Sequence, residues 1–283
     1  MPELPEVETV RAALADRVTH RTIQGVNVHC TAVVKGGPAT ALALLVGQRI
    51  AQADRHGKEL LIRTAVPPAE GACLCVHLGM TGSLRYWPPG EYTIQKHDHV
   101  VWQLDNGGEI VFRDPRRFGF IRPFDSVAAL YNQRWRRLGP DAQRITATQL
   151  HERLQHTRRA IKVALLNQTI LAGMGNIYVD ELLFRIGIDP RASACALSQP
   201  IVGKMVRAMR GILAQAIRAN GSTVRDYRDG IGRPGRFQLQ HKVYGRSRER
   251  CLICTTFLKT TRIGGRTTVY CPTCQKRGRA LLI

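Results

Sequence analysis

The C-terminal part of the chain contains the stretch CLICTTFLKTTRIGGRTTVYCPTC (residues 251–274), in which two Cys-x2-Cys pairs are separated by sixteen residues. Two such pairs at this separation can close a tetrahedral site of four thiolates around zinc. Gly264-Gly265 lies between Thr-rich flanks and predicts a β-hairpin. Zinc can contribute roughly 10–16 kcal/mol to a fragment too small to fold through its own core. The expected ligands of one structural zinc ion are Cys251, Cys254, Cys271 and Cys274.

The chain around this stretch is strongly basic. It has 42 Lys and Arg against 21 Asp and Glu over 283 residues, a net charge of +21. Such an excess opposes folding by self-repulsion, and a polyanion that neutralises it explains it best. Nucleic acid is the first candidate, because every phosphate neutralised releases counterions. A solubilising charge or a charge for a membrane surface is the alternative.

The sequence carries no sign of a membrane span or of export. No stretch reaches the ~18 apolar residues that a span needs, and the opening MPELPEVETV is acidic without an apolar run. We therefore expect an intracellular protein in a reducing compartment, where redox-active disulfides are the less favoured interpretation of the two cysteine pairs. The other four cysteines lack metal-ligand spacing and are expected to be small buried hydrophobes: Cys30, Cys73, Cys75 and Cys195.

Upstream of the cysteines, the pattern is helical. Thr146-x-x-Gln149 is typical of a capping box at a helix start, and helical patterning continues to about Asn220. A loop rich in Gly and Arg, residues 221–237, separates this region from the zinc module. On the other side, Leu138-Gly139-Pro140-Asp141 marks a linker.

The N-terminal part has a different period. An initial helix is predicted by Pro5 in its first turn and by an apolar stripe at Val7, Val10, Leu14 and Val18. Residues 23–123 then contain short apolar runs broken by Gly, Pro and Asn, which predict antiparallel strands in a sandwich.

These patterns together predict an α+β multidomain chain. It consists of an N-terminal helix with an antiparallel β-sandwich, a helical domain and a four-cysteine zinc hairpin. The expected boundaries are residues 1–135 for the sandwich, 136–148 for a linker, 149–240 for the helical domain with its loop 221–237, and 241–283 for the zinc module.

The chain resembles the formamidopyrimidine-DNA glycosylase family over nearly its whole length. Seven segments carry the resemblance, in the family's order: MPELPEVE (1–8), GKELL (57–61), HLGMTGSLR (77–85), KHDHV (96–100), DPRRFG (114–119), GMGNIY (173–178) and the four-cysteine finger. The family combines a β-sandwich that has an N-terminal helix with a helix–two-turn–helix domain and a zinc hairpin. The resemblance therefore implies the same three parts.

The resemblance implies catalytic roles for four residues. Removal of Met1 would expose the amine of Pro2, whose pKa of ~8 leaves more of it neutral than a lysine. Glu3 would act as general acid and base on the sugar, with Lys58 and Arg266 assisting base loss and elimination. Glu6 is expected to hold sugar or backbone. Taken without the family, Pro2 is a helix-entry proline, Lys58 and Arg266 are surface cations, and Glu8 complements the helix dipole.

Further residues are implied in DNA binding. Met80, Arg116 and Phe118 match the residues that fill the space left by an extruded nucleotide, although core packing is the alternative for Met80 and Phe118. Phosphate contacts are expected from His97, Arg116, Lys162 and Asn176. Family members often have Ile-Lys-Pro where this chain has Ile161-Lys162-Val163, which weakens the assignment of Lys162. Loop 221–237 corresponds to the loop that covers the everted base.

The resemblance predicts a base-excision enzyme that removes oxidised purines (8-oxoguanine and formamidopyrimidines) through a Schiff base on Pro2 and then cleaves the strand by β,δ-elimination. Its partner would be damaged double-stranded DNA, with no membrane. It would act as a monomer, cytoplasmic and associated with the bacterial nucleoid. One rival is the sister endonuclease VIII specificity for oxidised pyrimidines. A second rival, from a different class, is a non-catalytic protein that binds nucleic acid, which would have no need of the Met-Pro-Glu start.

Overall fold

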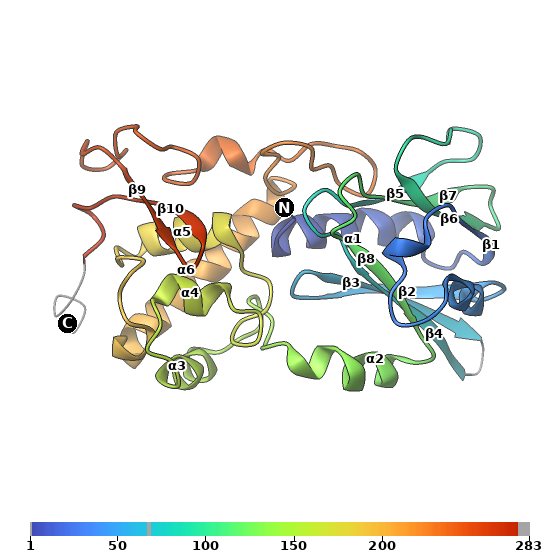
Figure 1. The fold of residues 1–283 in the computed structure, drawn as a ribbon, viewed down its shortest axis with the longest axis horizontal. Coiled ribbons are helices and arrows are strands. Elements are labelled where there is room, and N and C mark those ends of the chain that lie inside the picture. The colour runs from blue at the N-terminus through green and yellow to red at the C-terminus, as the bar shows by residue number, and fades with distance from the viewer. Residues whose placement is uncertain (1, 67–68, 277–283) are drawn as a thin grey trace. The chain divides into compact units, whose positions relative to one another are not determined.

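The computed structural model describes residues 2–66 and 69–276. The chain folds as two compact units (Figure 1). Met1–Arg136 and Ala219–Arg236 form the first unit, whereas Arg137–Arg218 and Phe237–Ile283 form the second. No helix in the described ranges has the length and apolar character that a bilayer crossing requires.

The first unit is a helix with two antiparallel sheets. Helix α1 (Leu4–Val18) contacts strands of both sheets. One sheet has the order β1 (Ile23–Val28), β6 (Asp98–Leu104), β7 (Glu109–Arg113) and β5 (Ser83–Trp87). The other has the order β2 (Arg49–His56), β3 (Glu59–Val66), β4 (Ala69–His77) and β8 (Phe120–Phe124). The short helices of this part are η1 (Thr31–Val33), η2 (Ala39–Leu45), α2 (Val127–Gln133) and η3 (Trp135–Arg137).

The core of this unit joins the helix to both sheets. The predicted stripe Val7, Val10, Leu14 and Val18 is fully buried and belongs to one cluster with Leu74 and Trp102, which confirms the helical period. A second cluster, on the other face of β3 and β4, contains Cys73, Cys75 and Leu130 of α2. Because both faces of β4 are covered, its sequence is a continuous apolar run rather than an alternating one. Cys73 and Cys75 are buried as expected, whereas Cys30 and Cys195 are only partly buried.

The second unit combines helices with the cysteine hairpin. Its helices are α3 (Ala147–Gln155), α4 (Ile161–Leu166), α5 (Asn176–Arg185), η4 (Ala194–Ala196), α6 (Gln199–Arg218) and η5 (Phe237–Gln240). Strands β9 (Lys259–Ile263) and β10 (Arg266–Tyr270) pair antiparallel across Gly264-Gly265, as the sequence predicts. The capping box is confirmed by hydrogen bonds of 3.2 Å and 3.0 Å between Thr146 and Gln149.

Ala219–Arg236 lies with the sandwich although it follows the helices in sequence. The sequence alone placed loop 221–237 in the helical domain, because no local sequence pattern shows which domain a loop will pack against. The Tyr86 backbone N–H of β5 donates to the Gly230 carbonyl oxygen at 2.8 Å. Gly230 also lies against α1, where a Cβ would come within 3.0 Å of the Val10 carbonyl oxygen. This segment is therefore fastened to the helix that begins at the chain start.

Candidate functional site

The start of α1 places two acidic residues beside Pro2. Pro2, Glu3 and Glu6 are all buried. The Glu3 backbone N–H donates to Glu6 Oε2 at 2.9 Å, which caps the helix start. The other oxygen, Glu6 Oε1, accepts from the Ser222 backbone N–H at 2.7 Å. The carboxylate of Glu6 thus binds backbone of its own chain and holds Ala219–Arg236 against the N-terminal turn.

Glycine is required where this segment meets Glu6. Gly221 has a φ of +78°, and a Cβ there would lie 2.8 Å from Glu6 Oε1. Both the left-handed backbone and the close approach exclude larger residues. The Tyr227 hydroxyl adds a hydrogen bond of 3.0 Å to the Glu6 carbonyl oxygen. Burial, together with the negative charge of Glu6, raises the pKa of Tyr227, which therefore stays a neutral donor.

Lys58 lies in the tight turn between β2 and β3 and is partly buried. The preceding Gly57 is buried and has a φ of +59°, a conformation that glycine adopts at little cost. The following Glu59 is buried and accepts hydrogen bonds from the Arg134 guanidinium and from Trp135 Nε1, the latter at 3.0 Å. The turn that carries Lys58 is therefore built on a satisfied buried carboxylate.

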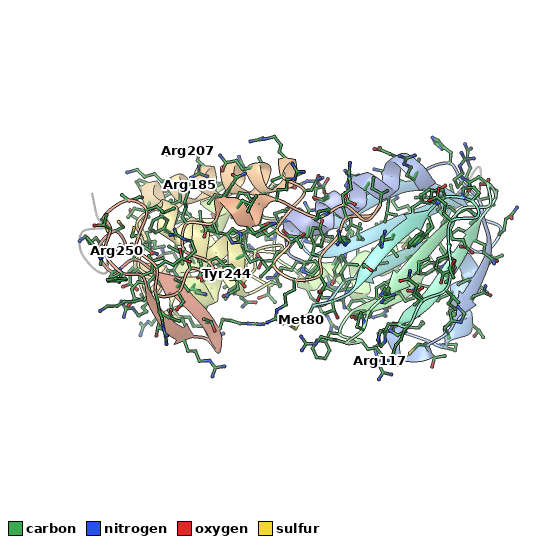
Figure 2. The ribbon with its side chains drawn as sticks, turned by 90° about the horizontal axis from the view of Figure 1, so that it is seen from above. Met80, Arg117, Arg185, Arg207, Tyr244 and Arg250 are labelled. Carbon is green, nitrogen blue, oxygen red and sulfur yellow. The ribbon has the colours of Figure 1, made fainter. Side chains whose placement is uncertain are left out.

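Two loops of the first unit expose large side chains next to arginines. Met80 is 39% exposed and Phe118 is 55% exposed, so core packing does not explain either residue. The Arg116 guanidinium lies 4.5 Å from the centre of the Phe118 ring. Figure 2 shows Met80 and Arg117 on loops of the sandwich. An exposed apolar side chain beside a stacked arginine is suited to enter a base stack.

Asp114 joins these two loops. Its carboxylate is fully buried and accepts from the Thr81 hydroxyl at 2.5 Å and from the Gly119 backbone N–H at 2.7 Å. A Cβ on Gly79 would lie 2.4 Å from the Gly119 nitrogen, so the loops meet where only glycines fit. Thr81 follows Met80, and Gly119 follows Phe118. The sequence did not single out Asp114, although an acid within an Arg-rich motif could have drawn attention to it.

His97 lies beside the same cluster. Its carbonyl oxygen accepts from the Asp114 backbone N–H at 3.2 Å, and its φ is +74°. Desolvation, followed by the nearby cations Lys96 and Arg113, lowers the pKa of His97.

In the second unit, Asn176 begins α5 after the GMG turn. Its Nδ2 donates to the Thr267 carbonyl oxygen of β10 at 2.9 Å. Its Oδ1 is buried and has no hydrogen-bond partner within the described ranges. Gln168 holds the turn itself, since its side chain bonds to the Gly173 N–H and to the Met174 carbonyl oxygen, both at 2.9 Å. The α5 N-terminus and the hairpin are thus linked at one point.

The position of Lys162 corrects its expected role. Its side chain is fully buried, and Nζ donates to Asp180 Oδ1 at 2.5 Å and to the Thr267 carbonyl oxygen at 3.1 Å. Burial raises the pKa of Asp180 to about 7, against the opposing effect of Lys162. An ammonium with no exposed surface cannot meet a phosphate in this arrangement. Lys162 instead fastens the hairpin to the helices.

Arg266 is exposed at the first position of β10, directly after the two glycines. The next residue, Thr267, receives the bonds from Asn176 and Lys162, so the backbone beside Arg266 is fixed. The sequence did not single out Glu181, whose buried carboxylate accepts three consecutive backbone N–H groups at 2.8–3.0 Å, the last from Tyr244. Two basic residues that follow the hairpin in the sequence, Arg277 and Arg279, lie outside the described residues.

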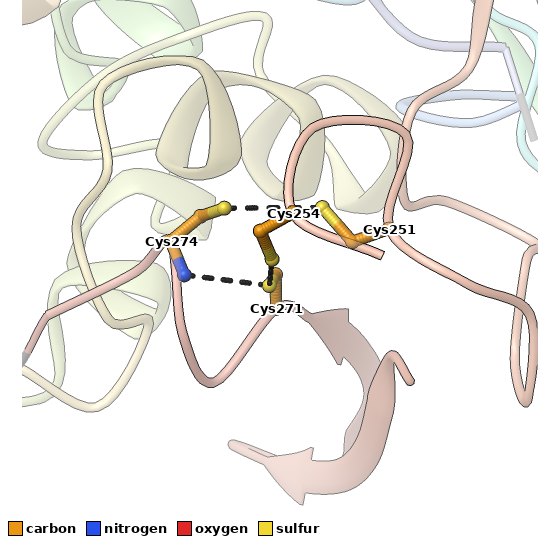
Figure 3. A group of neighbouring side chains, drawn as sticks. All are labelled: Cys251, Cys254, Cys271 and Cys274. Carbon is orange, nitrogen blue, oxygen red and sulfur yellow. Dashed lines mark hydrogen bonds between the residues drawn. The ribbon is translucent and has the colours of Figure 1, made fainter. Parts of the chain in front are cut away.

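The four predicted cysteines form one cluster, drawn in Figure 3, whose sulfur atoms lie within 4.8 Å of one another. The Cys251–Cys274 and Cys254–Cys271 sulfur distances are 3.8 Å and 3.4 Å. Zinc–sulfur bonds of ~2.3 Å in a tetrahedron place ligands ~3.8 Å apart. No cysteine is in a disulfide in the part of the chain that is described. The cluster fits one structural zinc ion with no open coordination position.

Family models match three parts of the chain. They are described as the formamidopyrimidine-DNA glycosylase N-terminal domain (residues 1–121), the formamidopyrimidine-DNA glycosylase H2TH domain (residues 138–228) and a zinc finger found in FPG and IleRS (residues 248–277). The three matches follow the order of the sandwich, the helices and the cysteine hairpin.

Relatives match over the full length. Proteins named formamidopyrimidine-DNA glycosylase from Laribacter hongkongensis and Bacillus licheniformis are 42% and 40% identical, each over 98% of this chain and 100% of the relative. A solved complex of a Lactococcus lactis FPG mutant with DNA containing Fapy-dG has a TM-score of 0.88 at 30% identity, covering 97% of this chain and 100% of that one. A complex of MutM with DNA containing carbocyclic 8-oxo-G has a TM-score of 0.87 at 31% identity, with the same coverage.

Proposed function

The chain belongs to the formamidopyrimidine-DNA glycosylase family and is a base-excision repair glycosylase, and from this premise we propose that the amine of Pro2 is its nucleophile. The proposed substrates are the oxidised purines 8-oxoguanine and formamidopyrimidine in duplex DNA. The observation that carries the proposal is the buried pair Pro2-Glu3 at the start of α1, held by the Glu6 carboxylate.

The proposed reaction begins with bond formation between the Pro2 nitrogen and C1′ of the damaged nucleotide. The C1′–base bond breaks, the Pro2 nitrogen gives up its proton, and the base leaves protonated. The sugar ring opens as its oxygen takes a proton from Glu3, which leaves an iminium at C1′. This cation acidifies the C2′ hydrogen, so loss of that proton expels the 3′ phosphate. A second elimination expels the 5′ phosphate, and water then releases the sugar remnant from Pro2.

Two cations assist in this proposal. Lys58, in the turn between β2 and β3, favours base loss and elimination. Arg266, exposed at the start of β10, binds phosphate and supports the later elimination. Bound zinc supplies the folding energy of the hairpin that carries Arg266. We expect His97 to contact a phosphate oxygen.

The exposed loops provide a way to open the duplex. An enzyme that attacks C1′ must first extrude the nucleotide and fill the space that it leaves. We propose that Met80 and Phe118 enter the stack and that Arg116 hydrogen-bonds to the orphaned base. The exposed tip of Ala219–Arg236, around Val224 and Arg225, would cover the extruded base. We expect the protein to act as a monomer on chromosomal DNA at the bacterial nucleoid.

Borohydride trapping tests this proposal. Protein lacking Met1 is mixed with a duplex that carries 8-oxoguanine, reduced, digested and analysed by mass spectrometry. The expected adduct lies on the N-terminal peptide. P2A should lose glycosylase activity, whereas P5A, which changes a proline of the same turn, should still form the adduct. Full activity of P2A, or an adduct elsewhere in the chain, would refute the proposal. Faster nicking of thymine glycol than of 8-oxoguanine would refute the proposed substrate class.

A further inference from the structure

Glu8, on the second turn of α1, has no part in the proposed chemistry. Its carboxylate lies between two arginines of the first unit. Arg11 approaches Oε1 at 2.7 Å and 2.9 Å, and Arg55 Nε donates to Oε2 at 3.0 Å. The Arg55 side chain is only 5% exposed, compared with 27% for Arg11. The two arginines therefore differ in environment although they share one acceptor.

Arg55 also binds the turn that carries Lys58. Its NH1 donates to the Gly57 carbonyl oxygen at 2.8 Å. One planar guanidinium thus connects α1, which begins directly after Pro2 and Glu3, with the peptide directly before Lys58. A guanidinium presents its donors in a fixed fork, so two simultaneous bonds fix both position and direction. Gly57 gives this backbone its positive φ of +59° but no side chain that could hold the turn in place.

Two simpler explanations of Glu8 are weaker. Interaction with the helix dipole falls off beyond the first turn, and Glu8 is the fifth residue of the helix. A partly exposed ion pair between residues three positions apart on a helix, such as Glu8–Arg11, contributes little to stability. Neither explanation accounts for a second, nearly buried arginine that bonds both to Glu8 and to the Lys58 turn.

We infer that Glu8 and Arg55 are positioning residues that set the Lys58 turn relative to the helix start carrying Pro2 and Glu3. The inference rests on the proposed function, because it requires that Pro2, Glu3 and Lys58 act at one site. Misplacement of a reacting group by about 1 Å can cost on the order of 100-fold in rate. Loss of the Glu8–Arg55 link should therefore slow chemistry without weakening DNA binding.

The test compares R55M with R11A in single-turnover cleavage of an 8-oxoguanine duplex. Arg11 is the matched control, since it shares Glu8 and also ties α1 to β2 through the Ala53 carbonyl oxygen at 3.2 Å, but the bonds described for it do not reach the Lys58 turn. We expect R55M to lose on the order of 100-fold in the single-turnover rate, with an unchanged Kd for the lesion duplex. R11A should keep both values. Equal losses in R55M and R11A would show a general tether and overturn the inference.

A second pair of variants covers the case in which R55M fails to fold. E8Q keeps an amide oxygen that can accept from Arg55, whereas E8A keeps nothing. The cleavage rate should fall in E8A and be largely retained in E8Q, and equal rates in E8A and the unaltered protein would overturn the inference. Borohydride trapping separates the two proposals. If the unaltered protein forms no N-terminal adduct, the proposed function fails. If it does, and R55M or E8A forms the adduct equally fast, only the positioning role fails.

Discussion

Replacing Lys162 by methionine tests whether this lysine is a structural residue or a phosphate contact. In the structure its ammonium bonds to Asp180 Oδ1 and to the Thr267 carbonyl oxygen and has no exposed surface. K162M leaves a buried carboxyl without its cation, a type of change that typically costs about 3–5 kcal/mol where the carboxyl is ionised. For a chain of this size, such a loss corresponds to a fall in Tm of roughly 6–20 °C.

The loss of stability in K162M should also depend on pH, and the titration of Asp180 determines the direction of that dependence. Its folded-state pKa is raised to about 7, so its contribution to stability is full below its unfolded pKa of ~3.9 and is lost as pH rises through 7. Lys162 opposes this rise, so removing it moves the folded-state pKa still higher. Above pH 7 the unaltered protein has lost this contribution, whereas K162M continues to lose stability by up to about 1.4 kcal/mol per pH unit.

Calorimetric unfolding at pH 6.5 and 8.5 measures the loss of stability and its dependence on pH. Titration with DNA at several salt concentrations tests whether Lys162 contacts a phosphate instead. The control is K204M, which removes an exposed lysine of α6 in the same unit. K162M/D180L, which replaces the pair by apolar groups, should recover part of the stability lost in K162M. Unchanged stability of K162M, combined with a salt slope that falls by about 0.9, would identify a phosphate contact and refute the structural role.

Three further predictions concern the other contacts of the site. D114A should destabilise the chain by roughly 3–6 kcal/mol, because the Thr81 hydroxyl and the Gly119 N–H both lose a charged acceptor; denaturant unfolding measures this, and a loss no larger than in D114N would contradict it. E6Q should speed hydrogen exchange at Ser222, since an amide has one oxygen for two donors, while exchange in β6 stays unchanged as the internal control. Chelation should release one zinc per chain and abolish protection in β9 and β10 but not in β6; a hairpin that stays protected without metal would show that zinc is not structural.

The sequence predicts those features that depend on local spacing. The α1 stripe follows from a period of 3.6 residues, and the zinc hairpin from two cysteine pairs around Gly264-Gly265. The exposure of Met80 and Phe118 could not be deduced in this way, because an apolar residue in a glycine-rich motif is equally compatible with a core. Only the surrounding fold distinguishes the two.

Features that depend on distant partners were beyond the sequence. Lys162 is buried by Asp180, 18 positions away, and by the Thr267 carbonyl oxygen, 105 positions away. No period or spacing links these positions, so the sequence offered only the family resemblance, which implied a phosphate contact for Lys162. The docking of Ala219–Arg236 depends in the same way on Glu6, whose bond to Ser222 spans 216 positions. A resemblance to a family can thus indicate that a residue matters, but it does not show which distant residues contact it in the fold.

The acidic residues explain how so basic a chain can fold while its surface stays cationic. Ten of the 21 acids are buried in the described part of the chain, against one buried cation, Lys162. Five of these acids accept hydrogen bonds from backbone N–H groups or from cations: Glu6, Glu59, Asp114, Asp180 and Glu181. These buried carboxylates satisfy donors inside the fold and add no negative charge to the surface, where it would repel phosphate. The exposed surface is consequently more positive than the net charge of +21 alone suggests. Glu8 is only partly buried, and its positioning role rests instead on the nearly buried Arg55, which bonds both to Glu8 and to the Gly57 carbonyl oxygen.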